Sequence, residues 1–159
     1  MNAKNLILIR HSYANSQSED GDFGRTLSEH GILKLNSQIE KLSALPKPKL
    51  IHVSSAKRTL QTCEWLNRLF KVTENHIWRS KELYHGSAHD YASIIESTPE
   101  QINSIALIAH NPSISYFGNS LCSDFVQGFS PGDILWLRSD NSGWNVQKAH
   151  WELELFLSE

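Results

Sequence analysis

The sequence predicts a three-layer α/β/α sandwich with a mainly parallel central sheet and an antiparallel C-terminal part. Consecutive apolar runs at 5–10, 49–53 and 105–109 are typical of strands that are covered on both faces. Segments with helical periodicity separate these runs, and helices that connect strands favour parallel pairing. A further apolar run at 134–137, followed by a turn signal, indicates the antiparallel part.

Length and composition favour a single domain over residues 1–159, since 159 residues can bury one hydrophobic core and no linker or repeat divides the chain. A formal charge of -2 argues against partners such as nucleic acid or an anionic membrane. The N-terminal apolar run is too short for a signal peptide or a membrane span, so we expect a cytoplasmic protein. We also expect a monomer. Cys63 and Cys122 are widely separated, which predicts two buried thiols.

The first half of the chain reads as strand, loop, helix, strand and helix. The run at 5–10 predicts a central strand, and a polar loop follows over 12–25. Ser28 is the expected N-cap of a helix, and Ser54 or Ser55 that of the next helix, after the strand at 49–53. The apolar positions of these two helices are Ile32, Leu35, Ile39 and Leu42, and then Leu60, Cys63, Leu66 and Phe70.

In the second half, Ser87 and Asp90 resemble a capping box that opens a third helix through Tyr91, Ile94 and Ile95. The strand at 105–109 leads into Asn111 and Pro112, the expected N-cap and first residue of another helix. The turn signal at 140–143 predicts a hairpin whose second strand begins near Trp144. One buried face is expected in the last segment, from the alternation of Trp151, Leu153, Leu155 and Leu157.

Charged and imidazole side chains follow the predicted strands. In open α/β sheets, ligands bind beyond the carboxyl ends of the strands, and these ends meet at one edge. The expected cluster has two guanidinium groups, two imidazoles, two helix N-termini and no carboxylate, which suits a phosphoryl group. Its members are Arg10, His11, Ser55, Arg58, His110 and Asn111.

Four segments in this order resemble motifs of the histidine phosphatase superfamily, also called phosphoglycerate mutase-like, and especially of its short, SixA-type phosphohistidine phosphatase branch. Residues 8–12 (Leu-Ile-Arg-His-Ser) resemble the R-H-G signature, and residues 25–31 the R-P-L-S/T-x-x-G segment. Residues 54–62 are similar to S-x-x-x-R-x-x-Q-T, and residues 108–112 to the second-histidine motif. Ser12 replaces the signature glycine, which is tolerable if its φ is negative, and Thr26 stands where proline is usual.

The resemblance implies a phosphatase in which His11 attacks phosphorus and forms a covalent phosphohistidine that water hydrolyses. Arg10, Arg58 and His110 would hold the phosphoryl oxygens, with Ser55 and Asn111 as further phosphate-binding residues. Whether the site raises or lowers the pKa of His11 stays open, because the arginines and a bound phosphate act in opposite directions. No cofactor is expected.

The substrate also stays open. A phosphorylated protein histidine is favoured, because no segment long enough for a lid remains and a departing imidazole can leave protonated. Small phosphoesters are the alternative, with Glu82 as the candidate general acid, although Glu82 reads equally well as a surface residue. A binding module without turnover is a third reading, disfavoured because the nucleophile is retained. No metal site is expected at His85 and His89, since a glycine and a helix cap interrupt that face.

Overall fold

Six strands form one mixed sheet in the order β3-β2-β4-β1-β5-β6 in the computed structural model, which describes residues 3–158. The strands are β1 (Lys4–Arg10), β2 (Leu50–Ser54), β3 (Ile77–Ser80), β4 (Ser104–Ala109), β5 (Ile134–Ser139) and β6 (Glu152–Leu157). The first four are mutually parallel, whereas β5 is antiparallel to β1 and β6 is antiparallel to β5. The predicted sheet, with a central first strand, is confirmed.

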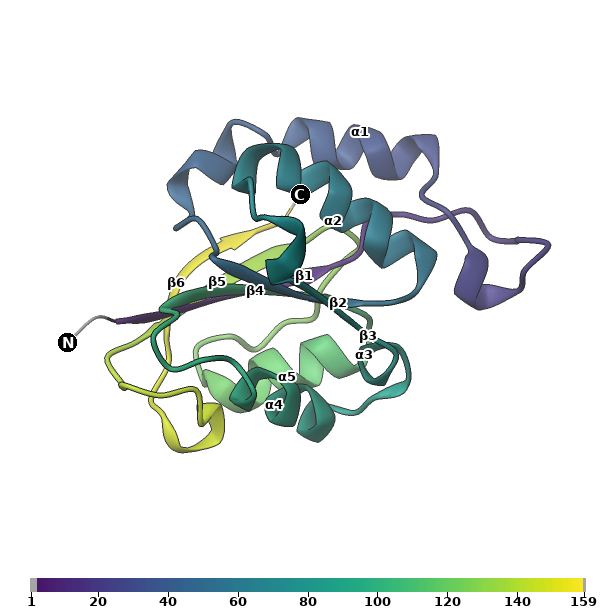
Figure 1. Ribbon diagram of the computed structural model, residues 1–159. Helices are drawn as coiled ribbons and strands as arrows, with labels where there is room; N and C mark the ends of the chain where they lie inside the picture. Colours follow the sequence, from purple (N-terminus) through teal and green to yellow (C-terminus); the bar gives the residue numbers. More distant parts are fainter. Residues whose placement is uncertain (1–2, 159) are drawn as a thin grey trace.

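Helices cover both faces of this sheet, as Figure 1 shows. On one face lie α1 (Glu29–Ser37) and α2 (Lys57–Phe70), and on the other α3 (Glu82–His85), α4 (Ala88–Glu96) and α5 (Ser113–Leu121). Short 3-10 turns add η1 (Asp22–Gly24), η2 (Lys41–Ala44), η3 (Glu74–His76) and η4 (Val146–Lys148). The three-layer α/β sandwich is therefore as predicted. No helix within residues 3–158 is long and apolar enough to cross a membrane.

Two hydrophobic cores lie on opposite faces of the sheet. Along β1, Leu6 and Leu8 belong to the core beneath α4 and α5, whereas Ile7 and Ile9 belong to the core beneath α1 and α2. All four side chains have no exposed surface, and burying such a side chain contributes about 1.5–3 kcal/mol. Burial on both faces explains the uninterrupted apolar run. This run stops at Ile9, so the charged Arg10 is the last residue of β1.

Two of the predicted helix caps are confirmed. The Ser28 hydroxyl accepts a hydrogen bond from the Gly31 amide, and Ser87 with Asp90 forms a complete capping box at the start of α4. Cys63 and Cys122 are buried free thiols, as expected.

The two caps expected beside the site are wrong. Ala56, and neither Ser54 nor Ser55, is the N-cap of α2, and its backbone amide donates to the Ser54 hydroxyl at 3.3 Å. Pro112 takes the N-cap position of α5, which begins at Ser113, one residue later than expected. The Asn111 side chain does not cap the helix, because its Nδ2 donates to the Phe129 carbonyl at 2.8 Å and its Oδ1 accepts from the Ser115 hydroxyl.

The apolar face expected for the first helix is only partly buried. Leu35 and Leu42 are buried, but Ile32 and Ile39 are 41% and 38% exposed. α1 ends at Ser37, and the chain continues through η2. The helical period therefore does not extend to residue 42, which places Ile39 at the surface.

The C-terminal hairpin differs from the prediction in its connection. β6 begins at Glu152, not near Trp144, because residues 140–151 form a long connection in which Trp144 and Trp151 stack with ring centroids 6.3 Å apart. A register shift between Trp136 and Leu137 then places Leu153 and Leu155 in different cores. The single buried face expected for this segment is therefore wrong.

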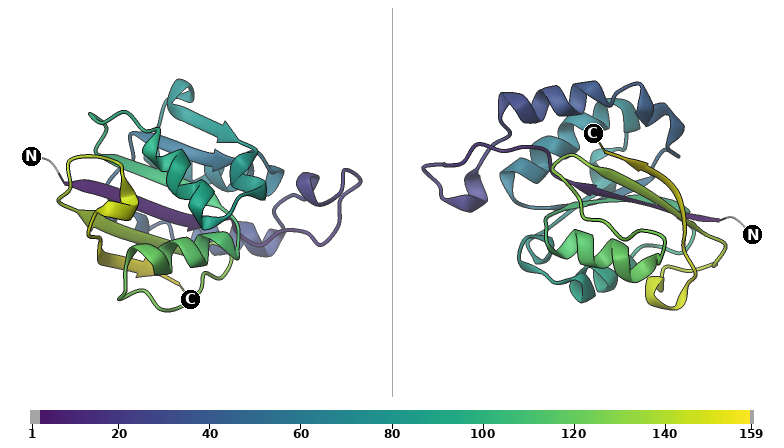
Figure 2. Two further views of the ribbon diagram at one scale, coloured as in Figure 1. Left: turned by 90° about the horizontal axis from the view of Figure 1, so that it is seen from below. Right: turned by 180° about the vertical axis from the view of Figure 1, so that it is seen from behind.

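A loop joins β1 to α1 and projects from the carboxyl end of β1, away from the body of the molecule (Figures 1 and 2). An isolated bridge between Ala14 and Leu27 closes the base of this loop. Gly21 has a φ of 74°, a conformation that favours glycine, and η1 follows directly. The loop thus carries η1 back beside α2.

Candidate active site

His11 follows the last residue of β1, and its amide donates to the Ala109 carbonyl at 3.1 Å. Its Nδ1 lies 2.7 Å from the Ser12 carbonyl oxygen. Because a carbonyl only accepts, Nδ1 carries the proton and Nε2 keeps its lone pair. Burial, followed by the charges of Arg58 and Arg10, lowers the pKa of His11 to about 4. The imidazole of the free site is therefore neutral at pH 7, so burial and the arginines favour the form that can act as a nucleophile.

Arg58 lies in the first turn of α2 and faces both imidazoles. Its Nε donates to His11 Nε2 at 3.3 Å, and its Nη2 lies 3.4 Å from His110 Nδ1. The side chain is buried, so its charge is poorly screened by solvent. A guanidinium placed in this way can hold two oxygens of a phosphoryl group in front of His11.

His110 follows β4, the parallel neighbour of β1, and its ring centroid lies 5.1 Å from that of His11. Because a guanidinium only donates, His110 Nδ1 accepts from Arg58, and Nε2 donates to the Ser54 hydroxyl at 2.8 Å. Burial, and then the neighbouring His11 and Arg58, lowers the pKa of His110 to about 3. Both imidazoles are therefore neutral in the free site.

Arg10, the last residue of β1, donates from Nη1 to the Phe129 carbonyl at 2.8 Å. Its Nε atom is buried and has no hydrogen-bond partner within residues 3–158. A buried donor left unpaired typically costs about 1–3 kcal/mol, so such groups often mark a ligand position. An anion at this site would satisfy it.

The loop before β5 positions this arginine. The Phe129 carbonyl also accepts from Asn111 Nδ2 at 2.8 Å, and the Gly132 amide donates to the carbonyls of Arg10 and His11. Below the loop, Lys34 and Asp133 form a buried ion pair with an Nζ to Oδ1 distance of 3.1 Å.

The remaining motif residues hold these segments together. Ser12 has negative φ, and its hydroxyl donates to the Gly31 carbonyl at 2.7 Å, so serine is compatible with the position of the signature glycine. The Thr62 hydroxyl accepts from the Ser12 amide at 3.1 Å, and Gln61 Oε1 accepts from the Leu27 amide at 2.7 Å. A Cβ added at Gly31 would lie 2.1 Å from the Tyr13 carbonyl oxygen, which explains the glycine.

The structure brings Arg10, His11, Arg58 and His110 to one edge of the sheet, as the sequence predicts. Asn111 reaches the cluster only through the Phe129 carbonyl that it shares with Arg10. The Ser55 amide donates to the Ser80 carbonyl at 3.1 Å and is therefore already used. Glu82 is exposed at the start of α3, and its described hydrogen bond is from its amide to Ser80.

Sequence reasoning missed a carboxylate in this cluster. Asp22 in η1 accepts from Arg58 Nη2 at 3.1 Å, from Arg25 Nη1 at 2.9 Å and from the Tyr84 hydroxyl at 2.6 Å. The expectation of a site without a carboxylate is therefore wrong. The only available signal was the position of Asp22 three residues before Arg25, within a loop that has no periodicity.

Solved structures of other proteins superpose on this chain over nearly its whole length. A protein assigned as the phosphohistidine phosphatase SixA from Nakamurella multipartitia superposes with a TM-score of 0.86 at 22% identity, covering 99% of this chain and 97% of that chain. The chain has the SixA fold. The protein histidine phosphatase SixA in complex with tungstate gives a TM-score of 0.77 at 19% identity, with 97% and 96% coverage.

The SixA fold extends to more distant phosphatases. The mycobacterial glucosyl-3-phosphoglycerate phosphatase matches with a TM-score of 0.69 at 15% identity, over 97% of this chain and 98% of that chain. No protein-family model and no curated protein matches the sequence. At these identities the similar structures establish the fold alone. Any inference about chemistry must come from the side chains of this chain, above all Arg10, His11, Arg58 and His110.

Proposed function

We propose that the chain is a phosphatase of the histidine phosphatase superfamily that removes the phosphoryl group from a phosphorylated protein histidine through phospho-His11. One observation carries this proposal: the unprotonated Nε2 of a neutral His11 faces the guanidinium of Arg58. The SixA fold supports it, as does the tetrahedral oxyanion tungstate in a protein that shares this fold.

In the first step, the Nε2 lone pair of His11 attacks phosphorus, and the bond to the leaving group breaks with its electron pair. Arg58 exchanges its hydrogen bond to His11 for one to a phosphoryl oxygen, and the unpartnered Nε of Arg10 donates to another. In the second step, water attacks phosphorus, and the electron pair of the P–N bond returns to His11 Nε2. Both protons of the water leave with the product as dihydrogen phosphate, and His11 is again neutral, with its proton on Nδ1.

A small phosphoester is the second candidate substrate, because a phosphatase for glucosyl-3-phosphoglycerate has a related fold. An alkyl ester leaves as an alkoxide and needs a proton. Glu82 is the donor that the sequence suggests, but it is exposed and has no described contact with His11, Arg58 or His110. The geometry therefore favours a leaving group that needs no strong acid.

The test measures phosphate release from a phosphohistidine-bearing transfer domain and from a panel of phosphoesters. We expect the wild-type protein to dephosphorylate the transfer domain and His11→Ala to be inactive. His150→Ala, which changes an exposed histidine in the connection before β6, is the matched control and should retain activity. Turnover that survives in His11→Ala would refute the covalent mechanism. Robust ester hydrolysis with an inert transfer domain would establish the small-phosphoester alternative.

A further inference from the structure

Asp22 lies at the exposed side of the site and bonds to three side chains. Its carboxylate accepts from Arg25 through Oδ1, and from Arg58 and Tyr84 through Oδ2. The Asp22 side chain is 52% exposed, whereas that of Arg58 is only 7% exposed. The Asp22 carboxylate therefore contacts the buried guanidinium on one side and is open to solvent on the other, where a ligand can reach it.

The Arg58 guanidinium presents two different edges. Its Nε and Nη2 face the imidazoles of His11 and His110, where the phosphoryl group would bind. Its Nη1 donates to the Asp22 carbonyl at 2.7 Å, and Nη2 to the Asp22 carboxylate at 3.1 Å. The carboxylate is thus held on the edge next to the phosphoryl position, and not in place of it.

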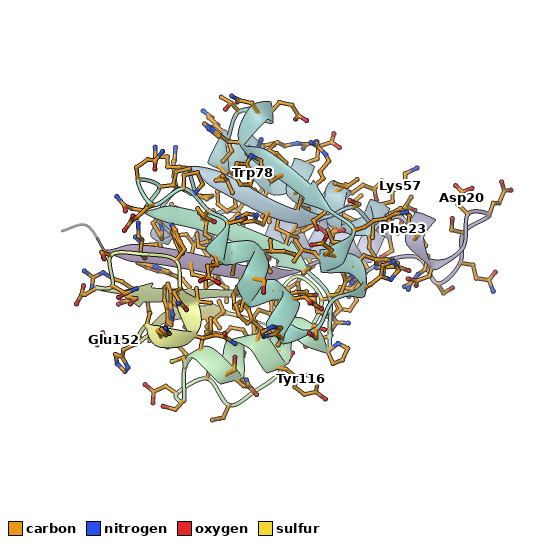
Figure 3. The ribbon with its side chains drawn as sticks, turned by 60° about the horizontal axis from the view of Figure 1, so that its bottom comes forward. Asp20, Phe23, Lys57, Trp78, Tyr116 and Glu152 are labelled. Carbon is orange, nitrogen blue, oxygen red and sulfur yellow. The ribbon has the colours of Figure 1, made fainter. Side chains whose placement is uncertain are left out.

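Aromatic rings line the same side of the site. The Tyr84 ring makes edge contacts with Phe23 and His110, at centroid distances of 4.9 Å and 5.5 Å. Figure 3 shows Phe23 on the inner part of the loop, toward the body of the molecule, and Asp20 farther out. These rings provide an apolar surface beside the carboxylate, which suits a flat leaving group with an N–H at its edge.

We propose that Asp22 is a specificity-determining residue for the leaving group, whose carboxylate accepts the ring N–H of a departing imidazole and so selects phosphohistidine over alkyl phosphoesters. This inference rests on the proposed function. Asp22 would recognise the imidazole ring of the substrate, whereas Arg10, Arg58 and His110 would bind its phosphoryl group.

The chemistry of the leaving groups explains the selection. In phosphohistidine the P–N bond breaks, its electron pair returns to the ring nitrogen, and the proton on the other ring nitrogen stays in its hydrogen bond to Asp22. A ring that enters protonated leaves as neutral imidazole, and no proton needs to be supplied. An alkyl ester would require a proton. The hydrogen bonds from Tyr84 and Arg25, and then the charge of Arg58, hold the pKa of Asp22 well below its usual range, so the carboxylate has no proton to give.

A purely orienting role for Asp22 predicts a different result. If the carboxylate only held Arg58 in place, its loss would weaken catalysis on every phosphorylated substrate to the same extent. The two roles separate in the ratio of kcat/KM values for two substrates. One is a phosphohistidine-bearing transfer domain, and the other is p-nitrophenyl phosphate, whose leaving group is stable as an anion.

The variant is Asp22→Asn, with Asp20→Asn as the matched loss of a carboxylate two residues earlier on the exposed loop. We expect Asp22→Asn to lower the ratio of phosphohistidine to aryl-phosphate kcat/KM by about tenfold or more, the size of one hydrogen bond to an ionised group. Asp20→Asn should keep the ratio within about twofold, as surface substitutions usually do. Equal losses on both substrates, or no loss, would overturn the role of Asp22 while leaving the phosphatase intact. A wild-type protein inert toward phosphohistidine would instead overturn the proposed function itself.

Discussion

The Nε–H of Arg58 points at Nε2 of His11 across 3.3 Å, so a permanently charged donor faces the nitrogen proposed as the nucleophile. The contact fixes the direction of the lone pair in the free site. It also disfavours a second proton on the ring, because a protonated Nε2 could not accept this bond. The same guanidinium is therefore expected to keep the nucleophile neutral and to bind the group that it attacks.

Replacing Arg58 with lysine should lower kcat/KM by about 10²–10³-fold, the loss typical of one donor to developing charge. Lysine keeps the positive charge but cannot contact both imidazoles and Asp22 from one planar group. Steady-state kinetics with the phosphohistidine domain checks this. Activity within a few fold of wild type would mean that a positive charge at position 58 is sufficient for catalysis and that the planar guanidinium is not required.

The imidazole of His11 should remain neutral well below the usual histidine pKa. Its pKa of about 4 means that it gains a proton only as the pH falls through that value. In an NMR titration, the His11 ring signal, assigned by its absence in His11→Ala, should keep its neutral-form shift at pH 5.5. A midpoint near 6.5 would show that burial and the arginines do not depress the pKa.

Stability should fall between about pH 6.5 and pH 4, in part through His52, whose pKa burial lowers to about 4. Above pH 6.5 this ring is neutral in both the folded and the unfolded state. As the pH falls, the unfolded chain gains a proton first, so the free energy of unfolding decreases, by about 2 kcal/mol at pH 5 from this residue. Urea unfolding at pH 7 and pH 5 measures the difference, which should be smaller in His52→Gln. An unchanged difference would exclude His52 as a cause.

Asp133→Asn should destabilise the protein by about 3 kcal/mol, because it removes one partner of a buried ion pair with Lys34. Asp133 also accepts from the Ser130 amide, in the loop that carries Phe129. Asp140→Asn breaks an exposed pair with Arg138 and should cost less than about 1 kcal/mol. Urea unfolding compares the two variants, and equal losses would mean that burial does not matter here.

The sequence predicts the site residues that lie at the carboxyl ends of strands. β1 and β4 are adjacent and parallel, so residues that follow them must meet, and the apolar runs before His11 and His110 locate both ends. The motif spacing then places Arg58 in the first turn of α2. The tautomers and the pKa of His11 could not be predicted, because they depend on the Ser12 carbonyl and on burial.

The elements that the sequence does not predict depend on tertiary contacts. Asp22 reaches Arg58 from a loop without periodicity, and its partner Tyr84 lies 62 residues away. Four residues of β3, which include Arg79, carry too short a pattern to predict a strand. The register shift between Trp136 and Leu137 cannot be recognised from the alternation in β6, and it places Leu153 and Leu155 on opposite faces of the sheet.

The most direct test of the phospho-His11 intermediate is rapid acid-free quenching of the protein with a phosphohistidine-bearing domain, followed by peptide mass spectrometry. We predict one phosphoryl group on the peptide that contains His11, formed within a single turnover and absent in His11→Ala. Phosphate release without any phosphorylated His11 peptide would contradict the covalent account.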